Sequence, residues 1–93
     1  MDQKTEEDGW RSFKKACLKV KSDEDLEVLF NFLLTPTERH EIAGRILIFR
    51  ELLSGEKTQR EIARDLGVSI ANISRGSNVL KTTGSQLEKF LEK

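Results

Sequence analysis

Residues 58–78 read TQREIARDLGVSIANISRGSN, and the residue types in this segment fit two short helices joined by a tight turn. Ile62 and Leu66 are four residues apart and predict the inner face of the first helix. Gly67 falls at the turn, where a positive φ angle costs glycine little. Val68 is expected to pack inward beneath this turn. The pattern is typical of a helix-turn-helix.

The second helix of this pair is predicted to be exposed at its start. Ser69 is its expected N-cap, small Ala63 lets the two helices approach closely, and Ile73 points into the core. This leaves Ile70, Ala71, Asn72 and Ser74 at the exposed N-terminal end. A recognition helix inserts these positions into the major groove of DNA. An ordinary helical hairpin with a glycine turn remains an alternative interpretation.

Charge is unevenly distributed along the chain. Residues 1–44 carry ten acidic and seven basic side chains, whereas residues 45–93 carry nine basic and six acidic ones. Around the expected helix-turn-helix the basic residues are Lys57, Arg60, Arg64, Arg75 and Lys81, against Glu61 and Asp65. This local excess suits contact with phosphates, although a solvated helix face often has the same composition.

Length and composition indicate a small protein that functions outside the membrane. Ninety-three residues suit one domain, residues 1–93, with a core that oligomerisation would enlarge. Residues 1–8 are polar and acidic, so we expect a flexible arm and no signal peptide. No apolar segment reaches the roughly 18 residues needed to cross a bilayer, which predicts no membrane partner and a cytoplasmic location. Cys17 is the only cysteine, so we expect neither an internal disulfide nor a metal site.

Apolar spacing predicts two helices before residue 35. Trp10, Phe13, Cys17 and Val20 form one stripe on a helix over about 9–21, and we expect Trp10 in the core. A second helix, capped by Ser22, is apolar nearly all round; the residues concerned are Leu26, Val28, Leu29, Phe30, Phe32, Leu33 and Leu34. A chain of this size can hardly surround such a helix, so we infer that a second copy covers it.

Capping boxes predict the later helix starts. Three segments follow the Thr/Ser-x-x-Glu pattern: 35–38, 58–61 and 85–88. Gly44 is expected to break the chain into a short helix ending near residue 43 and another that ends at Gly55. The last box predicts a separate final helix carrying Leu87, Phe90 and Leu91. No segment alternates with period two, so the predicted fold class is all-α.

Two segments of this chain resemble hallmark sequences of the tryptophan repressor family. They are LLTPTERHEIAGR, residues 33–45, and ELLSGEKTQREIARDLGVSIANISRGSNVLK, residues 51–81, with the same spacing between them as in the family. The resemblance implies a six-helix intertwined homodimer, with residues 22–53 as the dimer core and residues 58–78 as a helix-turn-helix DNA-reading head. It also implies a sequence-specific transcriptional repressor. Such a protein binds a palindromic operator when L-tryptophan is bound as co-repressor, and controls genes of tryptophan metabolism or uptake.

The same resemblance implies a set of tryptophan-binding residues. Arg45 and Arg75 would sandwich the indole ring, and Arg75 would also take the carboxylate, because a planar guanidinium both stacks on rings and forks onto carboxylates. The partner subunit would receive the ammonium group on backbone carbonyls from Phe32 to Leu34, with Thr35. Gly76 would leave room beside the ligand.

DNA contacts are implied in the same way. The residues expected at base edges or their waters are Arg60, Ile70, Ala71 and Asn72, and those expected at phosphates are Gln59, Ser74 and Lys81. Two positions depart from the family pattern. Asn72 stands where members commonly have threonine, and Val79 stands where a serine hydroxyl can approach the ligand's amino group. Losing one hydrogen bond weakens binding several-fold.

Two other functions stay open. One is a helix-turn-helix protein that binds DNA without tryptophan, and the other is a helical module whose apolar segment docks a protein partner. An enzyme is not expected, because the chain has no GxSxG, HExxH or P-loop pattern. His40, the only histidine, is interpreted as a solvated side chain.

Overall fold

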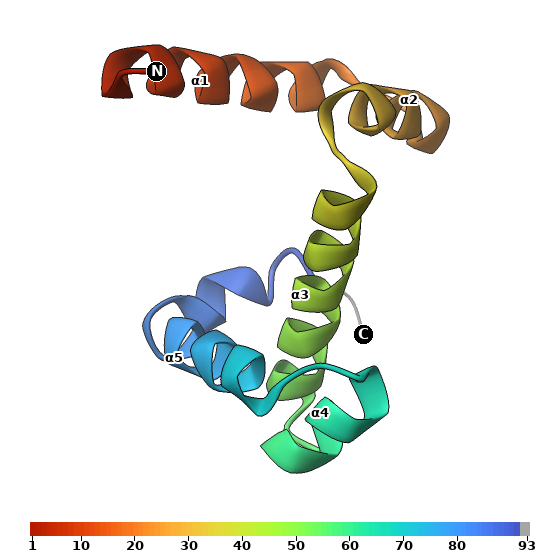
Figure 1. Cartoon of the computed structure of the whole chain (residues 1–93), viewed down its shortest axis with the longest axis vertical. Helices are drawn as coiled ribbons and strands as arrows, with labels where there is room; N and C mark the ends of the chain where they lie inside the picture. The colour runs from red at the N-terminus through yellow and green to blue at the C-terminus, as the bar shows by residue number, and fades with distance from the viewer. Residues whose placement is uncertain (92–93) are drawn as a thin grey trace. The chain divides into compact units, whose positions relative to one another are not determined.

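The computed structural model describes residues 1–91, without the side chains of 83–85, and every regular element in this part is a helix (Figure 1). The helices are α1 (Gln3–Lys19), α2 (Asp23–Leu33), α3 (Pro36–Ser54), α4 (Gln59–Leu66) and α5 (Ile70–Leu87). The predicted all-α fold is thereby confirmed. The contacts within the chain form two compact units, one over residues 1–35 and one from residue 36 onward.

The first unit consists of α1 and α2. α1 already begins at Gln3, because Asp2 accepts a 2.7 Å hydrogen bond from the backbone N–H of Thr5. Residues 3–8, expected to be a flexible arm, are therefore helical. Ser22 caps α2 as predicted, accepting from the backbone N–H of Asp25 at 3.1 Å.

Aromatic rings join the two helices of this unit. The ring centroids of Phe13 in α1 and Phe30 in α2 are 6.4 Å apart, and those of Trp10 and Phe13 are 5.2 Å apart. Trp10 is nevertheless 61% exposed within the single chain, so its predicted core position is wrong for the isolated chain. A two-helix unit has no third element to cover the outer side of this ring.

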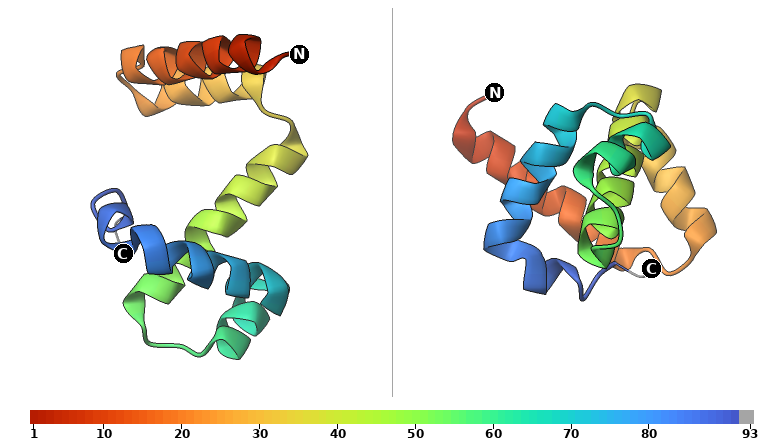
Figure 2. Two further views of the ribbon diagram at one scale, coloured as in Figure 1. Left: turned by 90° about the vertical axis from the view of Figure 1, so that its left-hand side faces the viewer. Right: turned by 90° about the horizontal axis from the view of Figure 1, so that it is seen from below.

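The second unit surrounds a small apolar core where α3, α4 and α5 all contact one another (Figure 2). Its buried side chains are Ile48, Ile62, Ala63 and Ile73, with Leu52, Leu66 and Val68 packed partly buried against them. Ile62 and Ile73 are 0% exposed, which confirms their predicted inward positions. Val68 also packs where the sequence predicted, next to the α4–α5 turn.

The ends of α4 and the start of α5 follow the predicted capping pattern. Thr58 and Glu61 form a reciprocal capping box, each side chain accepting from the other's backbone N–H at 3.1 Å. Gly67 ends α4 in the left-handed region, with φ 68° and ψ 35°. Ser69 then caps α5, accepting from the backbone N–H of Asn72 at 3.1 Å. Three local signals thus position the turn.

Two predicted helix boundaries are wrong. Gly44 lies inside α3, which runs unbroken from Pro36 to Ser54. A glycine costs a helix only about 1 kcal/mol relative to alanine, and packing of Ile48 and Leu52 in the core extends the helix across it. Likewise α5 continues through position 85 to Leu87, so the third capping box does not start a separate helix. The described residues therefore form five helices where six were expected.

Gly67 provides a test of the turn. Gly67→Ala is expected to lower the free energy of unfolding by about 1 to 2 kcal/mol, because a Cβ in the left-handed region crowds the following carbonyl. Beyond the residue itself and its two chain neighbours, no atom lies within 4 Å of that Cβ, so the cost is conformational. Gly9→Ala, within α1 and also unobstructed, should instead raise stability by about 1 kcal/mol. Urea unfolding measures the change in the free energy of unfolding for each variant. Changes of the same sign in the two variants would contradict this account of the turn.

Candidate functional site

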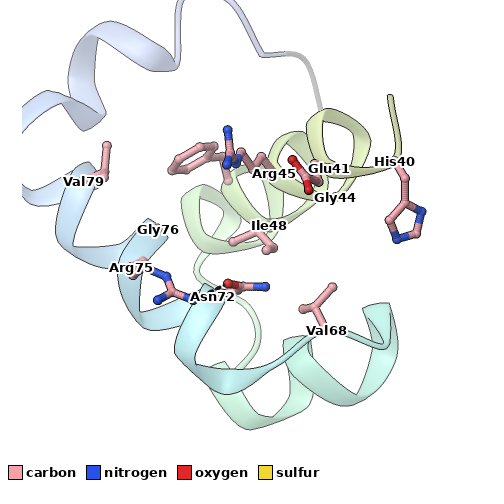
Figure 3. Close-up of a pocket in the computed structure, with 11 residues that line it drawn as sticks. His40, Glu41, Gly44, Arg45, Ile48, Val68, Asn72, Arg75, Gly76 and Val79 are labelled. Atoms are coloured by element: carbon pink, nitrogen blue, oxygen red, sulfur yellow. Dashed lines mark hydrogen bonds between the residues drawn. The ribbon is translucent and has the colours of Figure 1, made fainter. Parts of the chain in front are cut away.

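A pocket of about 660 Å³ lies between α3 and α5 (Figure 3). Its α3 wall is formed by His40, Glu41, Gly44, Arg45, Ile48 and Phe49. The opposite wall is formed by Val68, Asn72, Arg75, Gly76 and Val79. All of these residues belong to the second unit, and the volume is typical of a site for a small molecule.

Gly76 allows the two walls to meet at one end of the pocket. A Cβ built on this buried glycine would lie 3.2 Å from Cγ2 of Ile48 and 3.5 Å from Cδ1 of Leu52. The missing side chain therefore lets α5 approach α3 closely. Gly76 was expected to leave room for a ligand, and the structure shows a second reason for glycine, namely close helix packing.

Two arginines flank the pocket from opposite sides. Arg45 projects from α3 and Arg75 from α5 (Figure 3). Arg75 donates a hydrogen bond from Nη2 to Oδ1 of Asn72 at 2.6 Å. A site with two guanidinium groups beside apolar side chains suits a planar ligand that carries a carboxylate, because these groups stack on rings and pair with carboxylates.

The predicted tryptophan-binding residues fall into two groups. Arg45, Arg75 and Gly76 all line this pocket. Phe32, Leu34 and Thr35 belong to the first unit, and the family resemblance implies that they come from the partner subunit. Their role stays a prediction.

Some lining residues were not predicted to bind the ligand, although their helical spacing from the two arginines could have identified them: Glu41 had no predicted role, and Asn72 was expected at DNA. On α3, Glu41 and Arg45 lie four residues apart, and on α5 Asn72 and Val79 lie seven apart with Arg75 between them. Such spacing places side chains on one helix face. His40 is exposed, as expected for a solvated histidine, but it also lines the pocket.

The first turn of α5 presents its side chains to solvent. Ile70 is 49% exposed, and Ala71 and Asn72 are exposed as well. Among the other residues predicted to contact DNA, Arg60 and Lys81 are exposed, and Ser74 donates from Oγ to Oε1 of Gln59 at 3.1 Å. The last contact joins the start of α4 to α5.

Lys57 does not contribute to the basic surface in the way that the sequence suggested. Its Nζ lies 3.0 Å from Oδ2 of Asp65 and 3.5 Å from Oε2 of Glu51. The hydrogen bond between Lys57 and Asp65 raises the pKa of the ammonium and lowers the pKa of the carboxyl. Both groups therefore stay charged, and Lys57 is held in ion pairs with Asp65 and Glu51, which leaves its ammonium group less available to a phosphate.

The described residues also bear on metal and membrane binding. No three His, Cys, Asp or Glu side chains within residues 1–91 are gathered as a metal ion would require. In the same part of the chain, no helix combines the length and apolarity needed to cross a membrane.

Comparison with known proteins gives one consistent result. A family profile described as Trp repressor protein matches residues 8–93. A Trp operon repressor homolog of Chlamydia trachomatis serovar D is 49% identical over 88 residues, covering 95% of this chain and 94% of the relative. The homolog of Chlamydia caviae is 45% identical, covering 99% and 91%. That of Vibrio campbellii is 38% identical, covering 99% and 96%.

Proposed function

The chain belongs to the Trp repressor family, and from this premise we propose that it represses transcription by binding a palindromic operator when L-tryptophan occupies the pocket between α3 and α5. One observation carries the proposal. Arg45 and Arg75 flank a pocket large enough for a small molecule. Arg75 is hydrogen-bonded to Asn72, which lies on the solvent-exposed first turn of α5. The ligand site and the proposed DNA-reading surface are thus built on the same helix.

The proposed ligand follows from the chemistry of the pocket. The indole ring would lie between the guanidinium groups of Arg45 and Arg75, and Arg75 would also bind the carboxylate. Carbonyls from Phe32 to Leu34, with Thr35, would accept the ammonium group from the partner subunit. The side chain of Val79 supplies an apolar part of the wall but no hydrogen-bond acceptor.

A homodimer explains the apolar surface of the first unit. No residue of α2 is buried, and Phe32 is 84%, Val28 54% and Leu33 50% exposed. Monomeric proteins rarely expose so much apolar surface on one element. We therefore place the dimer core in residues 22–53, where a second chain would cover these side chains.

The dimer provides the geometry for operator binding. Two reading heads, residues 58–78 of each chain, would enter successive major grooves about 34 to 36 Å apart, as is general for helix-turn-helix dimers including this family. Tryptophan would set the separation of the heads. A coupling of about 1 to 3 kcal/mol between ligand and DNA is sufficient for regulation. The genes controlled would be those of tryptophan metabolism or uptake. The protein would act in the cytoplasm.

Base and phosphate contacts are assigned to different residues. Base edges or their waters would be met by Arg60, Ile70, Ala71 and Asn72. Phosphates would be held by Gln59, Ser74 and Lys81. The hydrogen bond between Gln59 and Ser74 supports this grouping, because it brings two of the proposed phosphate-binding side chains together.

Selection of DNA from a random duplex library tests the function. The library is incubated with the full-length protein, either without L-tryptophan or with about 1 mM L-tryptophan, which is near the upper end of typical metabolite concentrations. The bound DNA is then sequenced. We expect an inverted repeat to be enriched only when tryptophan is present. An inverted repeat enriched equally without tryptophan would favour ligand-independent DNA binding. Enrichment of no DNA in either condition would contradict the proposal.

Lys81 tests the assignment of phosphate contacts. Lys81→Ala should weaken binding to the selected duplex and to a random duplex alike, and should reduce the slope of log affinity against log salt by about one. Fluorescence anisotropy at several salt concentrations measures both quantities. Lys14→Ala removes the same charge from α1 and should leave the slope unchanged. An unchanged slope for Lys81→Ala would show that this side chain does not contact a phosphate.

A further inference from the structure

Asn72 connects the two parts of the second unit that the proposed function couples. Its side chain lines the pocket, and its Oδ1 accepts the 2.6 Å hydrogen bond from Nη2 of Arg75 (Figure 3). Its backbone N–H donates to Oγ of Ser69, which holds the residue in the capped first turn of α5. The anchor of the Arg75 guanidinium is therefore a residue with a well-defined backbone position.

The direction of the Asn72 amide follows from hydrogen-bond chemistry. Arginine has only donors, so the amide oxygen must face Arg75 and the NH₂ group must face away from it. The bond uses one of the two hydrogens on Nη2. The other hydrogen and a neighbouring N–H form an edge with two parallel donors, which is the arrangement that a carboxylate accepts.

We propose that Asn72 is a positioning residue, which holds Arg75 at the wall of the pocket so that a two-donor edge is available to the carboxylate of the bound ligand. This inference rests on the proposed function, since it concerns the same ligand. Arginine is a rotamer-rich side chain, and Arg75 is exposed. Holding it in place before binding reduces the ordering that the ligand must impose, which raises affinity without any direct contact between Asn72 and ligand.

The same bond limits what Asn72 does at DNA. An asparagine reads adenine with its amide oxygen and nitrogen together. While one lone pair of the oxygen is engaged by Arg75, the NH₂ group and the second lone pair are left for a base or a water, so that reading adenine would require the oxygen to serve both partners. Loss of the side chain should therefore affect tryptophan affinity more than tryptophan-free binding to random DNA.

Titration calorimetry with L-tryptophan, on the full-length protein, tests the proposal. Asn72→Ala should bind tryptophan roughly 3- to 10-fold more weakly than the parent. Asn72→Asp should bind tryptophan more weakly still. Its carboxylate would still accept from Arg75, but it would neutralise the positive charge that attracts the carboxylate of the ligand. Asn78→Ala is the matched control: it makes the same change at an exposed position of α5 that is absent from the pocket lining, and it should bind within twofold of the parent. Thermal unfolding of each variant checks the fold.

A spectroscopic measurement separates positioning from a general effect on the helix. In ¹⁵N NMR, the Arg75 guanidinium, identified by its loss in Arg75→Lys, should rotate more freely in Asn72→Ala and remain restricted in Asn72→Asp. Parent-like tryptophan affinity in Asn72→Ala, unchanged guanidinium rotation, or an equal loss of affinity in Asn78→Ala would each overturn the inference. Absence of tryptophan binding to the parent would overturn the ligand part of the proposed function as well.

Discussion

Arg75→Ala is expected to weaken L-tryptophan binding by roughly 100-fold and to abolish the effect of tryptophan on operator affinity. The variant loses charge-assisted hydrogen bonds to the carboxylate, each contributing about 1.5 to 3 kcal/mol, and stacking on one face of the indole ring. Titration calorimetry measures the ligand affinity. Fluorescence anisotropy with the selected operator, with and without tryptophan, measures the coupling.

Two further variants make this result specific. Arg75→Lys keeps the charge but lacks the planar fork, so its tryptophan affinity should fall between those of the parent and Arg75→Ala. Arg50→Ala removes an exposed arginine of α3 that is not part of the pocket lining, and should behave as the parent does. A response to tryptophan that survives in Arg75→Ala would remove this residue from the ligand site.

The second large effect concerns stability. Ile73→Ala is expected to lower the free energy of unfolding by about 2 to 4 kcal/mol, because it leaves a cavity among side chains that cannot easily move to fill it. Ile73 is 0% exposed and is one of the four buried residues of this core. A domain of ordinary stability has about 5 to 15 kcal/mol in total, so a substantial fraction would be lost. Urea unfolding followed by circular dichroism gives the value.

Graded substitutions provide the comparison. Ile73→Val removes one methylene group and should cost about 1 kcal/mol. Ile70→Ala makes the full change three residues earlier on the same helix, but at a side chain that is 49% exposed, and should cost clearly less than Ile73→Ala. Equal costs for Ile73→Ala and Ile70→Ala would mean that the core does not depend on Ile73.

The turn between α4 and α5 could be predicted from sequence because its determinants are local. The capping box of Thr58 and Glu61, the left-handed Gly67 and the cap at Ser69 each involve residues at most three positions apart, or a single backbone conformation. Ile62 and Ile73 followed from helical periodicity. In this segment the local capping signals and the packing of the core favour the same structure.

Other features depend on contacts that a local pattern does not contain. Gly44 resembles a helix end, but the helix continues because residues beyond it pack in the core. Lys57 resembles a phosphate-binding residue, but the α3–α4 loop brings it to Asp65 and Glu51. Trp10 resembles a core residue, but its ring packs beside that of Phe13 and is otherwise largely exposed in the described part of the chain. In each case the missing information was how the folded chain surrounds the residue.

The candidate site was predictable to a similar degree. The two arginines and Gly76 came from the family resemblance, and the structure brings them to one pocket. The hydrogen bond between Asn72 and Arg75 was not foreseen, because Asn72 was expected to contact DNA and was otherwise noted only as a departure from the family pattern. A three-residue spacing on a helix permits such a contact without requiring it.

The exposed first turn of α5 has a practical consequence for redesign. Ile70 and Ala71 take no part in the buried core, so libraries randomised at these two codons should yield folded regulators with altered target sequences. Asn72 belongs in such a library only if loss of effector response is acceptable, since its side chain is bonded to Arg75. Variants with an altered operator preference and variants with an altered response to tryptophan could thus be selected separately on one scaffold.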